Sequence, residues 1–203
     1  LDDLNERFPD HRDAGSLRVR VCGELARMGD EACARSVAET AEPRRNQNTQ
    51  QPSCPRDDDE NDERIMALNA LISMDSERAI PILESVLSRR DECSVALRRK
   101  AVFLVSTKHH ERTFDILARA ARQDPDREVR EQAVFWIGQT RDERAVEFLA
   151  SVVESDRDVE LQKKAVFALS QHRSNRAAEL LRNLAGRDAT PREVRLDAIF
   201  WLG

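Results

Sequence analysis

The chain has 203 residues, of which 40% are hydrophobic, 35% are charged and only 4% are aromatic, and its formal net charge is −5. No apolar run approaches the ~20 residues that a membrane-spanning helix needs, and the abundant aliphatic residues exclude a collagen-like or wholly disordered chain. The negative net charge gives no general attraction for a polyphosphate backbone, so we expect no nucleic-acid partner. Only 6 Gly and 7 Pro accompany abundant Ala, Leu, Glu and Arg, which favours helices.

An internal repeat of about 32 residues organises the sequence. Ala-Val-Phe recurs at 101–103, 133–135 and 165–167, and Ala-Ile-Phe follows at 198–200. A period of this length is typical of repeat architectures, whose units stack because none can bury its apolar face alone. We therefore predict one array over residues 1–203, with five units and the first helix of a sixth. In chain order, the predicted units lie near 17–41, 63–88, 93–123, 124–155, 156–186 and 190–203.

The chain begins at Leu1 and stops within the last predicted unit, so we expect a fragment or a chain trimmed at both ends. A polar, Pro-containing insertion at 42–62 separates the first two units, where the step from Val21 to Ala67 is 46 residues rather than 32. We expect an exposed or poorly ordered loop there. Its acidic run, 57–62, lacks the ligand order and central Gly of a calcium loop and is interpreted as solvated.

Each unit is predicted to contain two helices. In the fourth unit, the apolar spacing of a first helix is followed by a polar turn at 139–142 and a second apolar helix. The residues that carry this pattern are Val129, Ala133, Trp136 and Ile137, then Ala145, Val146, Phe148, Leu149 and Val152. Asp124, Asp126 and Asp158 are helix-start signals, and Pro125 and Pro191 fit near helix entries.

The pattern D-x-x-V-R-x-x-A-V-x-x-I-G, from Asp126 to Gly138, resembles the HEAT-like repeats of the phycobilin-lyase type. The resemblance implies an all-α fold, a right-handed α-solenoid of stacked two-helix HEAT-like repeats, and we expect a bacterial source. It implies little about function, because such repeats serve many unrelated tasks. The His-Glu pairs that hold iron in deoxyhypusine hydroxylase and the basic groove of HEAT-like DNA glycosylases have no counterpart in the matching helices.

The four cysteines have no zinc-site spacing, and two readings remain for them. Cys22 and Cys33 lie in apolar helical stretches and are interpreted as buried thiols. Cys54 and Cys93 lie in polar segments that fall on the same edge of neighbouring units, so a disulfide between them is geometrically allowed. That bond would favour an exported protein, in the periplasm or at the cell surface, and free thiols would favour a cytoplasmic one.

Two polar clusters have a structural and a functional interpretation. Arg98, Arg130 and Arg195 share one repeat position with Gln162, and form either a hydrogen-bond ladder between units or a ligand-binding row. His109 and His110, followed by Glu111, align with a turn between helices and are interpreted as a polar turn. We predict no metal site and no cofactor.

An aromatic row is the sharpest feature of the sequence. On a helical wheel, Phe135 falls opposite the buried Ala133, on the face that should line the outer, convex surface. The row comprises Phe103, Phe135, Phe167 and Phe200 at one repeat position, with Trp136 and Trp201 beside it. Either these rings form an apolar docking stripe, or they pack on one another between neighbouring first helices.

These observations predict a non-catalytic scaffold that binds protein partners through preformed surface. An accessory enzyme or a lyase-like chaperone, holding a small cofactor in the concave groove, is the alternative. A third hypothesis is an exported assembly subunit, which requires the Cys54–Cys93 bond.

Overall fold

The computed structural model describes residues 54, 62–172 and 174–203. The predicted unit near 17–41, Cys22, Cys33 and all of the insertion at 42–62 except residues 54 and 62 lie outside these residues. Within them every regular element is helical, and no strand occurs. The chain divides into two compact units between His110 and Glu111, and each is described separately.

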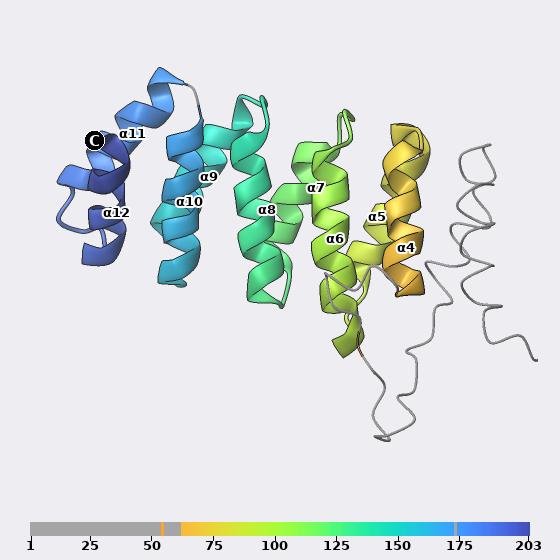
Figure 1. The fold of residues 1–203 in the computed structure, drawn as a ribbon. Coiled ribbons are helices and arrows are strands. Elements are labelled where there is room, and N and C mark those ends of the chain that lie inside the picture. Colours follow the sequence, from red (N-terminus) through yellow and green to blue (C-terminus); the bar gives the residue numbers. More distant parts are fainter. Residues whose placement is uncertain (1–53, 55–61, 173) are drawn as a thin grey trace, which may run out of the picture. The chain divides into compact units, whose positions relative to one another are not determined.

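In residues 62–110, which are the part of the first unit with described helices, there are three α-helices and two short 3₁₀ helices (Figure 1). They are α4 (Glu63–Ala70), η1 (Leu71–Ser73), α5 (Ser76–Ser88), η2 (Glu92–Ser94) and α6 (Val95–Ser106). Helix α6 packs against both α4 and α5.

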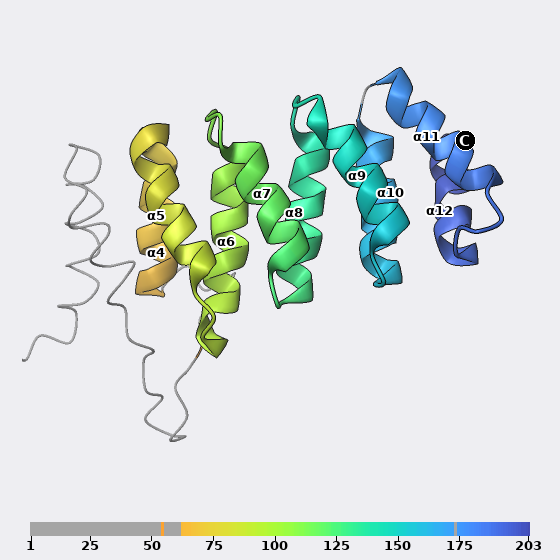
Figure 2. The same cartoon turned by 180° about the vertical axis from the view of Figure 1, so that it is seen from behind.

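The second unit is built from six α-helices in two layers. They are α7 (Thr113–Gln123), α8 (Arg127–Gln139), α9 (Arg144–Ser155), α10 (Val159–Gln171), α11 (Asn175–Gly186) and α12 (Arg192–Leu202). Helices α8, α10 and α12 lie side by side in one layer (Figure 1), and α7, α9 and α11 lie on the opposite face (Figure 2). Stacked helix pairs of this kind confirm the predicted all-α solenoid fold.

Aspartates at the helix starts confirm the predicted start signals, with one refinement. Asp126 and Asp158 are N-caps, and their carboxylates accept hydrogen bonds from the backbone N–H groups of Val129 and of Glu160, respectively. Asp124 instead accepts the N–H of Asp126 at 2.9 Å, so it shapes the loop before the helix. The same contact recurs one repeat later between Asp156 and Asp158, at 2.8 Å.

The core follows the predicted apolar pattern. Val129, Ala133 and Ile137 of α8 are fully buried, and the predicted residues of α9 are buried. Trp136 differs because it is only half-buried. It lies beside Phe135 at the edge of the layer, and the two ring centroids are 5.0 Å apart.

Helices α8 and α10 approach closely at a pair of small residues. A Cβ added to Gly138 would lie 2.7 Å from the Cβ of Ala168 and 3.0 Å from both its Cα and its carbonyl oxygen. These distances are shorter than van der Waals contact, so only glycine fits at this position. The close approach brings the outward-facing side chains of the two helices near one another.

Candidate functional site

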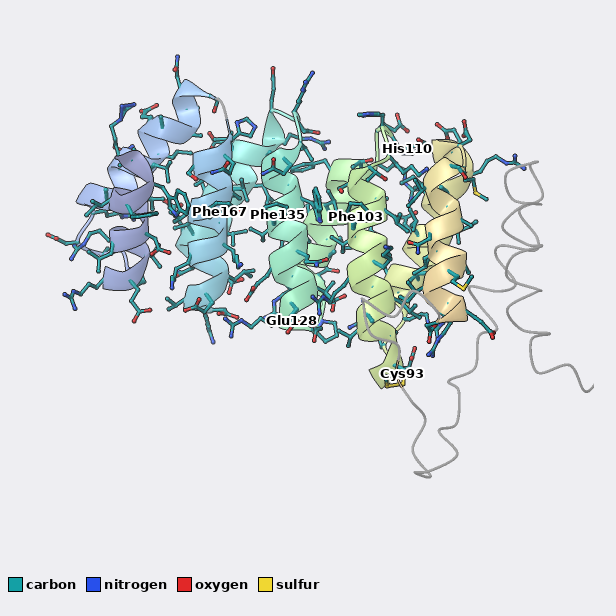
Figure 3. The ribbon with its side chains drawn as sticks, in the orientation of Figure 1. Cys93, Phe103, His110, Glu128, Phe135 and Phe167 are labelled. Atoms are coloured by element: carbon teal, nitrogen blue, oxygen red, sulfur yellow. A yellow bond between two sulfur atoms is a disulfide. The ribbon has the colours of Figure 1, made fainter. Side chains whose placement is uncertain are left out.

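The aromatic row of the second unit crosses three neighbouring helices. It consists of Phe135 and Trp136 on α8, Phe167 on α10, and Phe200 and Trp201 on α12; Figure 3 labels two of its rings, Phe135 and Phe167. The rings of Phe135 and Phe167 are nearly parallel, with an interplanar angle of 7° and centroids 6.2 Å apart. The ring centroid of Trp201 lies 4.9 Å from that of Phe167 and 4.9 Å from that of Phe200, and both pairs have edge-to-face geometry. The rings therefore form one continuous cluster.

The exposure of the row combines the two alternatives that the sequence left open. Phe135 and Phe167 are half-buried, because each ring is covered on one side by an aromatic ring of the neighbouring helix. Trp201 is 39% exposed and Phe200 is 71% exposed. Phe135 and Phe167 thus stack between first helices and still present apolar surface to solvent, whereas the exposure of Phe200 and Trp201 is that of the last helix of the given sequence. Offset or edge contacts between rings contribute about 1 kcal/mol beyond the burial of area.

Phe103 occupies the same repeat position on α6, in the first unit. It is half-buried, and the ammonium of Lys100 lies 5.6 Å from its ring centroid. A cation at this distance from an aromatic face is attracted by the ring quadrupole.

The arginine and glutamine position forms hydrogen bonds to backbone, as the ladder interpretation predicts. One guanidinium nitrogen of Arg130 donates to the carbonyl oxygens of Asp124 and Pro125, at 3.0 and 3.2 Å. Gln162 donates to the carbonyl oxygens of Val153 and Asp156, at 3.0 and 2.8 Å. Each of these side chains therefore connects a first helix to the end of the preceding repeat.

Arg98 and Arg195 differ in detail. Arg98, which is 2% exposed, donates to the carbonyl oxygen of Arg89 and to the hydroxyl of Ser94. Arg195 donates to the carboxylate of Asp188 at 3.1 Å. In all four repeats, the side chain at this position contacts the segment before its own helix. This position is therefore structural.

The change from arginine to glutamine at 162 has a physical explanation. A guanidinium nitrogen of Arg130 lies 3.6 Å from the carboxylate of Asp158, the N-cap of the next first helix. For Gln162, the N-cap of the next first helix is Pro191, at the start of α12, and this residue carries no charge. Arg130 therefore lies near an acid of the next repeat, whereas the corresponding position after Gln162 carries no acid.

A double-mutant cycle tests this explanation. We expect Gln162→Arg alone to destabilise the fold, because it buries a cation without an acid. Adding Pro191→Asp should restore the pair, with a coupling free energy of about 1 kcal/mol in the double variant. Urea unfolding of the four proteins measures this coupling, and a value near zero would contradict the explanation.

Charged residues of the second helices form ion pairs between neighbouring repeats. Arg144 contacts Asp115 at 2.9 Å, and Arg176 contacts Glu147 at 2.9 Å. Arg144 also lies over the ring of Phe114, at 4.2 Å from its centroid. The sequence indicated mixed charge on these helices but not the pairing, although both acids and both arginines recur with the repeat period. These side chains link consecutive second helices.

The turn between α6 and α7 contains the two adjacent histidines. His110 lies 3.3 Å from the carboxylate of Glu77, and its side chain is almost completely buried. The neighbouring Lys108 donates to the carbonyl oxygens of Ile72 and Met74, and burial lowers the pKa of its ammonium. Across residues 54, 62–172 and 174–203, no group of three or more His, Cys, Asp or Glu side chains gathers as a metal site would require.

Cys54 and Cys93 are joined by a disulfide bond in the structure, and their Cα atoms are 4.5 Å apart. Cys54 is exposed, and Cys93 is half-buried in η2, directly before α6. The bond links Cys54, which lies in the insertion, to the segment directly before α6.

Comparisons with known proteins support the repeat assignment. The family model for HEAT repeats matches residues 114–203, which span nearly all of the second unit. No curated protein matches the chain significantly. Within the described helices, none combines the length and apolarity that crossing a bilayer requires. The phycobilin-lyase type stays a prediction, whereas the repeats themselves are established over residues 114–203: this part of the chain consists of HEAT-like repeats.

Proposed function

We propose that the protein is a non-catalytic scaffold that binds a protein partner through the aromatic row on α8, α10 and α12. HEAT repeats generally serve as protein-interaction scaffolds, and the family match supports that class of function. The observation that carries the proposal is the cluster of partly exposed rings that crosses three helices.

The geometry of the row suits binding. Aromatic residues dominate the energetic centres of protein interfaces, because they bury a large area at a small cost in side-chain entropy. Here the stacking of Phe135 on Phe167 already restrains both rings before a partner arrives. A restrained surface loses little further freedom on binding, so more of the contact energy contributes to affinity.

The layer formed by α7, α9 and α11 also favours the aromatic row as the binding surface. Charged side chains of α7, α9 and α11 are occupied by ion pairs between units, such as Asp115–Arg144 and Glu147–Arg176. Their role in holding the repeats together accounts for their presence. The partly exposed rings of the first helices have no such complete structural account.

The double variant Phe135→Ser/Phe167→Ser tests the proposal. We expect it to retain its helical circular dichroism, to lose about 1–2 kcal/mol of stability, and to bind the partner at least ~100-fold more weakly. Binding is measured by chemical cross-linking and affinity capture from the native source, with each captured protein quantified by mass spectrometry.

Gln139→Ser/Gln171→Ser is the matched control. These exposed glutamines lie on the same two helices, one turn beyond the phenylalanines. Capture that depends on the phenylalanines and not on the glutamines supports the proposal. Undiminished capture by the Phe variant would contradict the aromatic row as the binding surface, and failure of that variant to fold would show that the rings are core.

The disulfide supports a location in an oxidising compartment, since exposed disulfides do not persist in the reducing cytosol. Alkylation of the protein from its native source without prior reduction tests this location. Cys54 and Cys93 should remain unmodified, and alkylation of either thiol would favour the cytoplasm instead.

A further inference from the structure

The bond between Cys54 and Cys93 closes a loop around a whole helix pair. The two cysteines are 39 positions apart in the sequence, and α4, η1 and α5 lie between them. Cys54 precedes α4, and Cys93 lies in η2, directly before α6. Helix α6 packs against both α4 and α5. The bond therefore joins the chain before the α4–α5 pair to the start of the helix on which this pair packs.

Hydrogen bonds restrain the α4–α5 pair at its other end. The ammonium of Lys108, just after α6, donates to the carbonyl oxygens of Ile72 and Met74, at 2.9 and 2.6 Å. Both carbonyls lie in the connection between α4 and α5. Figure 3 shows Cys93 at one end of α6 and His110, from the same turn as Lys108, at the other end. The disulfide and the Lys108 hydrogen bonds thus restrain opposite ends of the pair.

Helix α4 is short and depends on packing. It has 8 residues, whereas the other α-helices of the described residues have 11 to 13. Helices shorter than about 12 residues are marginal in water on their own. Four aliphatic side chains of the pair are at most 1% exposed: Ile65, Leu68, Ile80 and Leu83. Opening of the pair exposes these side chains, and a cross-link opposes opening because it restricts the conformations of the opened chain.

The loop that contains Cys93 is held by hydrogen bonds that do not involve the disulfide. Arg98, which is 2% exposed, donates to the carbonyl oxygen of Arg89 and to the hydroxyl of Ser94. The hydroxyl of Ser94 in turn donates to the carbonyl oxygen of Asp91 at 2.6 Å. We therefore expect Cys93 to keep its position after reduction, ready for the bond to form again.

We infer that the Cys54–Cys93 bond is a redox-controlled clamp on the α4–α5 pair, which a dithiol reductant opens. Cys54 is exposed and Cys93 is half-buried, so a thiolate of the reductant attacks the sulfur of Cys54. The S–S bond breaks, and its electron pair leaves with the sulfur of Cys93, which takes up a proton. The second thiol of the reductant then attacks the mixed disulfide, closes the reductant's own disulfide and releases Cys54 as a thiol. Two electrons and two protons pass from the dithiol to the protein.

The clamp makes the folded state of the first unit depend on its redox environment. In an oxidising compartment the bond forms and the α4–α5 pair stays packed. In the presence of a dithiol the pair opens more often and exposes its apolar side chains. The second unit contains no cysteine, so its stability should not respond. This inference concerns the first unit and does not rest on the proposed function of the aromatic row.

Hydrogen–deuterium exchange of the full chain, read by mass spectrometry, tests the clamp with and without dithiothreitol. We expect the amides of α4 and α5 to exchange roughly 100-fold faster after reduction, because the opened state is no longer restrained. Amides of α8, α9 and α10 should be unaffected, and oxidised dithiothreitol should restore slow exchange in α4 and α5. Unchanged exchange in α4 and α5 after complete reduction, equal acceleration in both units, or no recovery on reoxidation would contradict the inference.

Two pairs of substitutions assign the effect to this bond. In Cys54→Ser/Cys93→Ser, α4 and α5 should exchange as fast as in the reduced wild type, and dithiothreitol should cause no further change. The matched control, Cys22→Ser/Cys33→Ser, keeps the Cys54–Cys93 pair and should respond to dithiothreitol as the wild type does. A response that persists in the first variant, or disappears in the control, would show that other cysteines carry it and would overturn the clamp.

Discussion

Gly138→Ala should destabilise the protein by about 2 kcal/mol, although alanine is the better helix former. The added methyl group would lie 2.7 Å from the Cβ of Ala168 and 3.0 Å from its backbone. Because backbone atoms cannot rotate away, α8 and α10 must separate, which exposes core residues such as Val134 and Val166. The stack of Phe135 on Phe167 spans the same two helices, so partner binding should weaken as well.

Gly186→Ala is the matched control for this result. Gly186 is exposed at the end of α11, and nothing lies within 4 Å of the position of an added Cβ. Urea unfolding followed by circular dichroism should show no loss of stability for this variant. If the two alanine variants have equal stabilities, the close approach of α8 and α10 does not limit the packing.

Asp62→Asn should destabilise the first unit by about 3 kcal/mol, because it removes a negative charge that contacts a buried guanidinium. Asp62 caps α4 and accepts two side-chain hydrogen bonds from Arg64, at 3.0 and 2.8 Å. The two side chains are only 9% and 5% exposed. Asparagine preserves the capping geometry, so the variant isolates the loss of charge.

Asp142→Asn is the control that tests whether the burial of the ion pair determines the effect of the substitution. Asp142 and Arg144 have the same spacing and the same paired hydrogen bonds, but their side chains are 28% and 52% exposed. Solvent screens an exposed pair, so this variant should lose much less stability than Asp62→Asn. Comparable losses in the two variants would show that burial does not determine the strength of the pair.

The contribution of Asp62 should also depend on pH. Burial alone would raise the pKa of its carboxyl group, but the hydrogen bonds and charge of Arg64 outweigh burial and hold the pKa below the usual 3.8. The stabilisation is therefore fully present above pH 3.8 and is lost as the pH falls through the lowered pKa of the folded state. The difference in stability between wild type and Asp62→Asn should narrow in acid. A constant difference between about pH 7 and pH 2 would contradict this assignment.

The sequence predicted the helical repeats because their signal is periodic. Apolar spacing in each helix, the recurring Ala-Val-Phe and the capping aspartates all indicate the same pairs of helices, and the structure has them at those residues. The arginine ladder was also predictable, since a polar group at a fixed repeat position must meet the same backbone groups in each unit.

The partial burial of the aromatic row was not predictable from one helix. A helical wheel places Phe135 opposite the core, and only the position of the neighbouring helix determines that the ring of Phe167 covers it. That position depends in turn on the contact of Gly138 with Ala168, two small residues whose pairing no spacing rule indicates. The ion pair of Arg144 with Asp115 likewise depends on the distance between second helices.

Tryptophan fluorescence tests the docking surface most directly. The chain has 2 Trp and no Tyr, and both tryptophans, Trp136 and Trp201, lie in the aromatic row. Acrylamide quenching of their emission should fall when a partner captured through the row is added, because the partner excludes the quencher from the indole rings. The same addition to Phe135→Ser/Phe167→Ser should leave quenching unchanged. Binding that leaves the quenching of the wild-type protein unchanged would contradict the account, since it would place the partner elsewhere.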